Sequence, residues 1–305
     1  MSSGSKARLP DFIAVGPPRT ATTWLDRVLS GRVGLPREVK ETHFFSWHYS
    51  KGLDWYLDHF RECPAHLPIG EVCASYFDSV HARHRIAQHI PRCKIICTLR
   101  DPVQWLYSFY RLQRRVGRVA VGFEAALVKH FDLMFSRTRF AFLTAGWQQS
   151  FGRDNVLVLL LDDLVNDRQA CLDRLCNFIG ISRIAVDPSA AVGDGANLIT
   201  HAPRSRRLAH NASHLMDWMR EHRMYGTIER LERAGVWRYC LEGGEKFEPI
   251  DPALEARLRE LLRPEVYALE CILERDLSAW KNPPPGQVAP REAQDGSRDW
   301  QLPRR

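Results

Sequence analysis

A short loop rich in hydroxyl groups carries the first candidate chemistry in this sequence. Residues 16–23 read GPPRTATT, directly after an apolar run at 11–15 and directly before a stretch with helical spacing. A loop that leaves a parallel strand and opens a helix points backbone N–H groups at one spot, and the helix dipole adds partial positive charge. Arg19 adds a charged fork suited to phosphate or sulfate oxygens. The loop therefore predicts a site for such a group.

This loop departs from the nucleoside-triphosphate pattern G-x-x-x-x-G-K-[ST]. When Gly16 is aligned with the first glycine, Ala21 takes the place of the second. Thr22 then stands at the lysine position, and Thr23 at the hydroxyl that binds Mg²⁺. The positive charge has moved to Arg19, which disfavours a kinase or NTPase and favours a donor that needs no Mg²⁺. On this motif alone, a Pro/Thr-rich turn with an exposed arginine stays open.

A second candidate element follows the apolar run 94–99, KIICTL. Arg100 ends this run, and Ser108 lies two helical turns further on. The carboxyl ends of strands are where open α/β sheets place ligands, so both side chains are candidates for ligand contact. Taken singly, the arginine fits a helix-entry turn with a local ion pair, and the serine fits an exposed helix surface.

The densest set of titratable groups lies at residues 40–45, KETHFF. Lys40, Glu41 and His43 stand within four positions, directly before two phenylalanines. A positioned carboxylate or imidazole can accept a proton from a nucleophile. The alternative is a charged loop leading into a core Phe pair.

Together these segments resemble the PAPS-dependent sulfotransferases, where PAPS is 3′-phosphoadenosine 5′-phosphosulfate. Their 5′-phosphosulfate loop runs G-x-x-[KR]-x-G-T-T-x-L, and residues 16–25 here read GPPRTATTWL. Arg19 stands where many members have Lys, and Ala21 where Gly is usual. In that family a strand-end Arg and a later Ser bind the 3′-phosphate, and residues 244–251, GEKFEPID, are similar to a late loop that closes over the nucleotide. The resemblance thus implies PAPS as donor, PAP as product, no required metal, and nucleotide contacts from Arg19, Thr20, Ala21, Thr22, Thr23, Trp24, Arg100, Ser108 and Lys246.

Two segments are similar to the heparan-sulfate-type branch in particular, which includes the N-deacetylase/N-sulfotransferases and the 3-O-sulfotransferases. Residues 40–45 match K-E-x-H-F-F, and residues 51–56, KGLDWY, match G-x-D-W-Y. The resemblance makes Glu41 the catalytic base and lets Arg19 and Lys40 stabilise the leaving oxygen. His43 remains a rival, because a histidine is the base in the cytosolic sulfotransferases. Val72 replaces the lysine of that branch's E-K-[ST]-x-x-Y-F segment, which argues against a heparan-like acceptor.

Apolar runs alternating with helical stretches predict an α/β protein with a P-loop-like, three-layer fold, in which helices flank a central, mainly parallel sheet. Strands are expected at 11–15, 69–72, 94–99 and 156–161, and helices from 23, over 103–115 and over 167–179. Residues 204–275 have a helical pattern. We expect one sulfotransferase domain over 1–281, and a disordered tail over 282–305 because that tail is rich in Pro, Gly and charge.

The bulk composition bounds the remaining possibilities. The 305 residues carry a formal net charge of +7, which suits an anionic partner. There is no membrane span, and eight scattered cysteines indicate reduced core thiols rather than a metal site, so we expect a cytoplasmic, bacterial-type soluble member. The acceptor is expected to be a small molecule or saccharide, and the oligomeric state stays open. The alternatives are a P-loop nucleotide kinase and a basic nucleic-acid-binding protein, although no nucleic-acid motif is evident.

Overall fold

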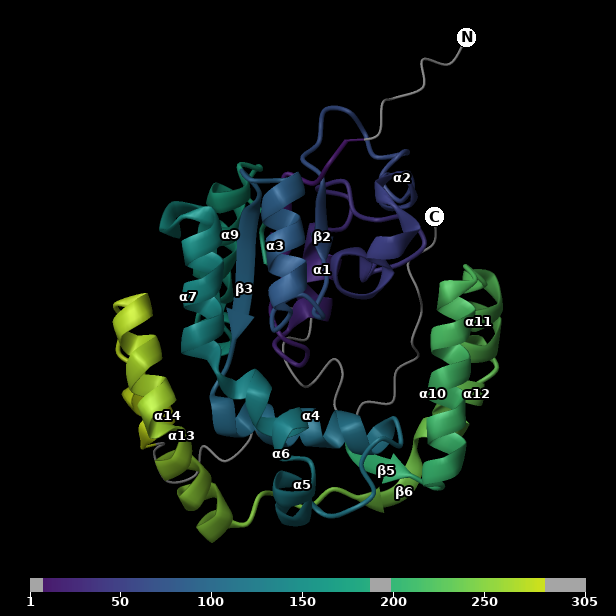
Figure 1. The fold of residues 1–305 in the computed structure, drawn as a ribbon, viewed down its shortest axis with the longest axis vertical. Coiled ribbons are helices and arrows are strands. Elements are labelled where there is room, and N and C mark those ends of the chain that lie inside the picture. Colours follow the sequence, from purple (N-terminus) through teal and green to yellow (C-terminus); the bar gives the residue numbers. More distant parts are fainter. Residues whose placement is uncertain (1–7, 187–198, 283–305) are drawn as a thin grey trace.

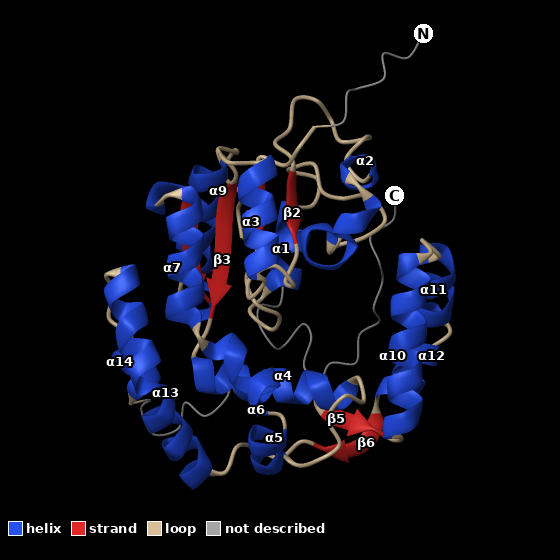
Figure 2. Ribbon diagram, viewed as in Figure 1, coloured by secondary structure: helices blue, strands red, loops and turns tan. Residues whose placement is uncertain are grey.

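A four-stranded parallel sheet forms the centre of the molecule (Figure 2). The computed structural model describes residues 8–186 and 199–282. The strand order is β2-β1-β3-β4, with bounds Gly70–Val72, Phe12–Ala14, Lys94–Leu99 and Val156–Leu160. Both central strands are buried on both faces, as their continuous apolar runs predict. All four predicted strands are confirmed, except that Leu161 begins helix α8 (Leu161–Asn166) instead of ending β4.

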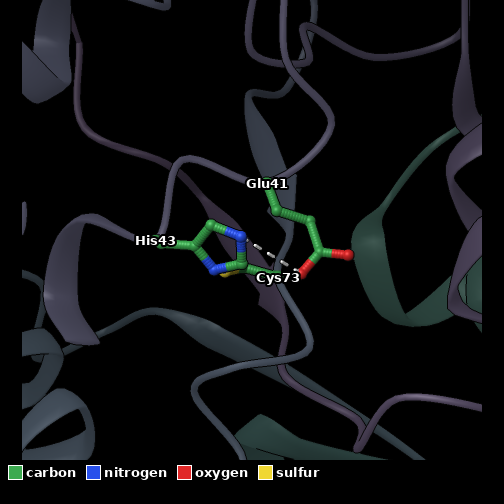
Figure 3. A group of neighbouring side chains, drawn as sticks. All are labelled: Glu41, His43 and Cys73. Carbon is green, nitrogen blue, oxygen red and sulfur yellow. Dashed lines mark hydrogen bonds and ion pairs between the residues drawn. The ribbon is translucent and has the colours of Figure 1, made fainter. Parts of the chain in front are cut away.

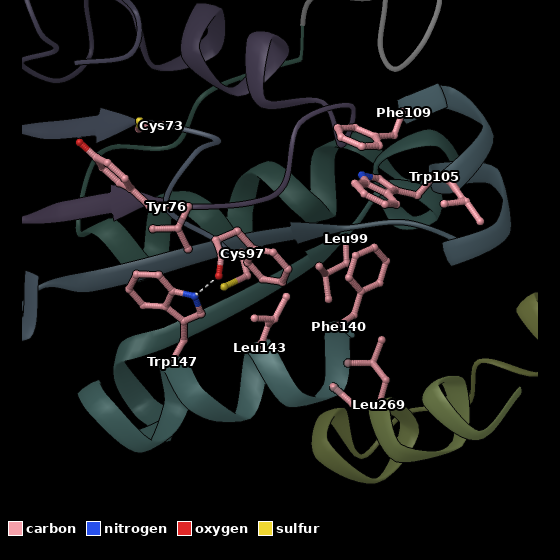
Figure 4. Close-up of a cluster of buried hydrophobic side chains, with 14 of the residues drawn as sticks. Cys73, Tyr76, Cys97, Leu99, Trp105, Phe109, Phe140, Leu143, Trp147 and Leu269 are labelled. Carbon is pink, nitrogen blue, oxygen red and sulfur yellow. Dashed lines mark hydrogen bonds between the residues drawn. The ribbon is translucent and has the colours of Figure 1, made fainter. Parts of the chain in front are cut away.

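Helices cover both faces of this sheet, so the predicted three-layer architecture is confirmed (Figure 1). Helices α1 (Thr22–Leu29) and α9 (Arg168–Ile179) pack on one face, and α3 (Val80–His89) and α7 (Phe140–Phe151) pack on the other. Alternate strand residues divide between the two cores: Phe12 and Ile96 face α1, whereas Ile13 and Cys97 face α7. Figure 4 shows the second core, where the Trp147 indole donates to the Phe77 carbonyl at 3.0 Å.

The helix that follows β3 is capped by its own sequence. Helix α4 (Pro102–Arg115) begins after Asp101, whose carboxylate accepts hydrogen bonds from the backbone N–H groups of Val103 and Gln104. Pro102 occupies the first turn, where its missing N–H costs nothing. The cap formed by Asp101 and the proline after it together define where α4 begins at the end of β3.

A buried charge cluster ties the long C-terminal helix to the start of α4. Helix α13 spans Pro252–Leu273, and its Arg259 donates to Asp101 at 2.8 Å and to Glu255 at 2.5 Å. All three residues are buried, with exposed fractions of 7–8%. Two carboxylates therefore share one buried guanidinium directly beside the end of β3.

The segment from β5 to β6, residues 201–246, forms an arm that extends from α4 (Figure 1). Helices α10 (Arg206–Glu221), α11 (Tyr225–Arg233) and α12 (Val236–Leu241) pack on one another. The helical pattern predicted there is confirmed, but it missed an antiparallel pair, β5 (His201–Pro203) with β6 (Gly243–Lys246). These strands are short and largely exposed, so they lack the apolar signal of the central strands. The shorter elements are η1 (Phe44–His48), η2 (Tyr49–Lys51), α2 (Leu53–Asp58), α5 (Phe123–Lys129), α6 (Phe131–Phe135), η3 (Ser136–Thr138), η4 (Arg153–Asn155) and α14 (Ser278–Lys281).

Two sequence-based expectations concern the ends and the membrane. The tail predicted to be disordered, 282–305, lies outside the described residues apart from Asn282, and the single-domain assignment stays a prediction. Within the described ranges, no helix combines the length and apolar character that crossing a bilayer requires.

The Asp101–Arg259–Glu255 cluster gives the first testable prediction. Arg259→Met should lower the free energy of unfolding by about 3–5 kcal/mol, because it leaves two buried carboxylates without their cation. Urea unfolding at pH 7 measures this change. Arg257→Met is the matched control: the same helix carries Arg257, which is exposed and bonded only at the surface to Glu124 at 2.7 Å, so a change under about 0.5 kcal/mol is expected. Equal losses in the two variants would contradict the role given to the cluster.

Candidate active site

The loop after β1 is held by buried hydrogen bonds to the neighbouring elements. The Thr20 hydroxyl bonds to the Pro17 carbonyl at 2.6 Å and to the Thr98 hydroxyl of β3 at 2.7 Å. The indole N–H of Trp105 on α4 donates to the Pro18 carbonyl at 2.8 Å. At Gly16 a Cβ atom would lie 2.0 Å from the Thr98 hydroxyl oxygen, so only glycine fits this crossing.

Two non-glycine residues of the loop adopt the left-handed backbone conformation. Arg19 has φ 71° and Ala21 has φ 66°, directly before α1 begins at Thr22. This conformation costs a residue with a Cβ roughly 1–2 kcal/mol, so it persists only where the surroundings impose it. Glycine would adopt the conformation of Ala21 without this cost, which explains why the phosphosulfate-loop pattern has glycine at that position. No side chain among the described residues caps this helix start.

The two predicted nucleotide elements meet in space. The Arg19 Nε donates to the Ser108 hydroxyl at 3.0 Å, and Arg100 Nη1 donates to the Arg19 carbonyl at 3.3 Å. Arg100 is 7% exposed and Ser108 only 1%. Arg19 thus meets Arg100, 81 positions later, and Ser108, 89 positions later. They converge beyond the carboxyl ends of β1 and β3, as the parallel sheet requires.

Lys40 joins the loop to the candidate base. Its ammonium donates to the Thr22 hydroxyl at 3.2 Å and to Glu41 Oε1 at 2.9 Å, while the Ala74 N–H donates to Glu41 Oε2 at 2.9 Å. Burial opposes the ionisation of Glu41, but the charge of Lys40 and these hydrogen bonds outweigh it and hold the pKa of Glu41 below its usual 4.5. Glu41 is therefore a carboxylate at neutral pH.

His43 lies beside this carboxylate and is neutral at pH 7. Burial is the main cause that lowers the pKa of His43 to about 4, against the opposing charge of Glu41. Its Nδ1 shares a hydrogen bond with the Ser75 hydroxyl at 2.8 Å, and its Nε2 lies 4.0 Å from Glu41 Oε2. The exposed Trp47 stacks on its ring, with centroids 4.2 Å apart. The arrangement holds the imidazole in one orientation next to Glu41.

Glu41, His43 and Cys73 offer ligand atoms that all lie within 4.8 Å of one another (Figure 3). The thiol approaches Nδ1 of the imidazole at 3.5 Å, whereas the carboxylate faces Nε2, so the two do not converge on one ring nitrogen. Burial raises the pKa of the Cys73 thiol well above its usual 9.0, and a metal would need the thiolate. The cluster fits a hydrogen-bonded group better than a metal centre, and the absence of a metal requirement stays a prediction.

Glu71 is a component that the sequence analysis did not select. This fully buried carboxylate on β2 accepts hydrogen bonds from the Thr42 N–H at 2.9 Å, the Thr42 hydroxyl at 2.6 Å and the Tyr56 hydroxyl at 2.9 Å, and Tyr76 lies at 3.3 Å. Thr42 stands between Glu41 and His43, so Glu71 fixes the segment that carries both. A charged residue inside the apolar run 69–72 was the signal that could have identified it.

Two further residues predicted to contact the nucleotide, Trp24 and Lys246, do not line the same cleft as Glu41. The Trp24 indole packs into the core under α1 with Leu25 and Leu172, and it also lines a small cavity with Thr20 and Ala21 of the loop. Its contact with the nucleotide stays a prediction. Lys246 lies on β6, in a second cleft of about 430 Å³ that Tyr107 and Tyr110 of α4 also line. The late loop therefore packs over the helix that carries Ser108, where the ring of Phe247 lies 6.1 Å from that of Tyr110.

A cleft of about 690 Å³ opens beside these groups. Pro18 of the loop, Glu41, His43 and Ala74 line its inner end. The phosphate-type loop and the titratable pair thus face one cavity, which is the geometry that group transfer between two bound molecules requires.

Comparison with known proteins now gives the family. Residues 9–191 match the family model described as a sulfotransferase domain, which is more than half of the chain. The chain belongs to the sulfotransferase family. The predicted membership is therefore confirmed.

Two curated relatives are bifunctional heparan sulfate N-deacetylase/N-sulfotransferases. The human protein numbered 2 is 39% identical over 120 residues, which cover 36% of this chain and 14% of that protein. The mouse protein numbered 4 is 29% identical over 197 residues, which cover 57% of this chain and 22% of that protein. The chain thus spans less than a quarter of the length of these relatives. A solved sulfotransferase from Alicyclobacillus acidocaldarius has a TM-score of 0.65 at 23% identity, covering 90% of this chain and 99% of that one, and so shares the fold.

Glu71 gives the prediction that tests the support of this sulfotransferase site. At pH 5, Glu71→Gln should lower the free energy of unfolding by about 1–3 kcal/mol, because the amide nitrogen replaces an oxygen that faces the donors of Thr42 or Tyr56 and cannot accept their hydrogen bonds. Burial raises the pKa of Glu71 from 4.5 to about 7 in the folded protein. Its contribution to stability is then complete below pH 4.5 and is lost as the pH rises through about 7, with a slope of at most about 1.4 kcal/mol per pH unit.

Urea unfolding at pH 5, 6, 7 and 8 tests this slope. The difference between wild type and Glu71→Gln should shrink as the pH rises, whereas the exposed control Glu62→Gln should show no such trend. Parallel pH profiles for wild type and Glu71→Gln would contradict the titration assigned to Glu71.

Proposed function

We propose that this chain transfers a sulfuryl group from PAPS to a hydroxyl or amine acceptor by in-line displacement, with Glu41 as general base. The observation that carries the proposal is the position of Lys40, which bonds at once to Thr22 of the loop and to Glu41. One ammonium thus links the group that binds the donor to the group that deprotonates the acceptor.

The described residues suit the two charged ends of PAPS. Positive charge surrounds the loop where the 5′-phosphosulfate would bind. It comes from the N-terminus of α1, from Arg19 and from Lys40. Arg100 and Ser108 offer a guanidinium and a hydroxyl at the end of β3 for the 3′-phosphate. No described element supplies the lysine that a nucleoside-triphosphate loop places before its Ser or Thr, which supports the sulfate donor over ATP.

Sulfuryl transfer requires a base to deprotonate the acceptor and a positive charge to stabilise the leaving group. The acceptor oxygen or nitrogen attacks sulfur while the bond from sulfur to the 5′-phosphate oxygen breaks, and the electron pair leaves on that oxygen. Glu41 is ionised and lines the cleft, so it can accept the proton that the acceptor loses. Arg19 and Lys40 are placed to stabilise the negative charge on the leaving oxygen.

His43 supports the base in this proposal and does not replace it. Its Nδ1 is committed to Ser75, and its Nε2 is directed toward Glu41. A neutral imidazole in this place orients the carboxylate and shields it from solvent. The same two side chains give the clearest experimental separation of the rival bases.

We also propose a reducing, cytoplasmic setting. All eight cysteines are free, and six of them are buried in the core. Free thiols at this number are typical of a compartment that does not form disulfides.

Glu41→Gln should reduce kcat by at least about 10³-fold while PAP still binds, because the amide keeps the shape of the side chain but cannot accept a proton. PAP binding by calorimetry and turnover of radiolabelled PAPS with an acceptor measure the two properties. His43→Gln serves as the comparison and should retain much more activity. Near-normal turnover of Glu41→Gln together with loss in His43→Gln would assign the base to His43.

The donor assignment has its own test. PAP should raise the melting temperature of the wild-type protein more than ATP with Mg²⁺ or a DNA oligomer at equal concentration. Arg100→Ala and Ser108→Ala should each weaken PAP binding, with the arginine change larger by about tenfold, since a bond to a charged donor is the stronger one. Stabilisation by ATP with Mg²⁺ and none by PAP would favour a kinase, and stabilisation by DNA alone would favour a nucleic-acid-binding protein.

A further inference from the structure

The lining of the large cleft includes an exposed tryptophan. Trp47 is 65% exposed, yet its position is fixed: its backbone N–H donates to the His43 carbonyl at 2.8 Å within the π-helical turn η1. Its ring stacks on the His43 ring at an interplanar angle of 24°. One face of the indole is thus covered by the imidazole beside Glu41, and the residue lines the cleft.

Further apolar side chains continue this surface into the cleft. Phe109 and Leu112 contribute from α4, Leu133 from α6 and Val80 from the start of α3. An exposed indole that no core requires is costly in water, and the usual reason for one in a cleft is a ligand ring that packs against it.

The charges that line the cleft are balanced. Four charged side chains face it: Glu41, Asp78, Arg118 and Arg137. Arg137 pairs with Asp78 at 2.6 Å and lies over the Phe109 ring, and Arg118 lies 4.0 Å from Asp217 of α10. None of the described lining residues is a lysine. Arg137 is therefore paired before any acceptor enters, whereas Arg118 shares Asp217 with Arg220, which is the closer partner at 3.1 Å.

We propose that the acceptor is an uncharged molecule with an aromatic or sugar ring, one face of which stacks on Trp47, and that a polyanionic chain is excluded. This inference rests on the proposed function, because it concerns the second substrate of the same site. A chain of sulfates or carboxylates would have to separate Arg137 from Asp78 to bind it, and it would meet the negative charges of Asp78 and Glu41. An uncharged ring neither breaks an ion pair nor is repelled by the carboxylates, and it covers the exposed face of the indole.

The experiment uses the full chain saturated with PAP, so that no turnover is needed for the first readout. Calorimetry measures binding of three probes: 2-naphthol as an aromatic alcohol, cellobiose as a neutral saccharide, and N-desulfated heparin oligosaccharide as a polyanion. At least one of the first two should bind more tightly than the third. Preference for naphthol or for cellobiose then distinguishes the two kinds of ring.

Trp47→Ala should weaken binding of the preferred neutral probe by about tenfold, and Trp47→Phe should restore most of it, since a smaller aromatic face remains. In turnover with PAPS, the alanine variant should raise KM for that probe by a similar factor and change kcat little. Trp218→Ala is the matched control, because Trp218 is a tryptophan 49% exposed on α10 that does not line the cleft. Melting temperatures should be unchanged in all three variants.

Three results would overturn the inference: tighter binding of the heparin oligosaccharide, no binding of either neutral probe, or equal affinity in wild type and Trp47→Ala. Each of these leaves PAP binding intact. Loss of PAP binding by the wild-type protein is a different outcome, and it would contradict the proposed function itself.

Discussion

The common edge at which parallel strands end is the constraint on which the site depends. The loop at 16–23 follows β1, Arg100 follows β3, and Ala74 follows β2. Since the three strands run in one direction, these segments arrive at the same edge although they lie far apart in sequence. Segment 40–43 has no strand of its own and reaches this edge only because Glu71 and Ala74 bond to it.

The site is therefore assembled by buried polar contacts rather than by hydrophobic packing alone. Thr20 with Thr98, Glu71 with Thr42, and Arg259 with Asp101 each join two elements below the cleft surface. Buried polar pairs of this kind add little net stability but are costly to break, so they select one arrangement of the loops. This accounts for the way in which two left-handed residues can persist in the phosphate-type loop.

The sequence predicted the elements whose signals are local. The four apolar strands, the helix after Asp101 and the loop at 16–23 each depend on residues adjacent in the chain, and all were placed within a few positions. Long-range pairing was not predictable in the same way. Nothing local indicates that Glu71 bonds to Thr42, or that β5 pairs with β6 across about forty residues.

The distribution of charge separates the two halves of the proposed reaction. The formal net charge of +7 alone suggested an anionic partner without saying where it binds. In the fold, Arg19, Arg100 and Lys40 converge around the loop, whereas Arg137 of the adjoining cleft is paired with Asp78. Positive charge is thus concentrated where a multiply charged donor would sit, whereas the lining of the adjoining cleft carries two positive and two negative side chains. Such a gradient favours a charged molecule on one side of Glu41 and an uncharged one on the other, which is the arrangement that a base between two unlike substrates needs.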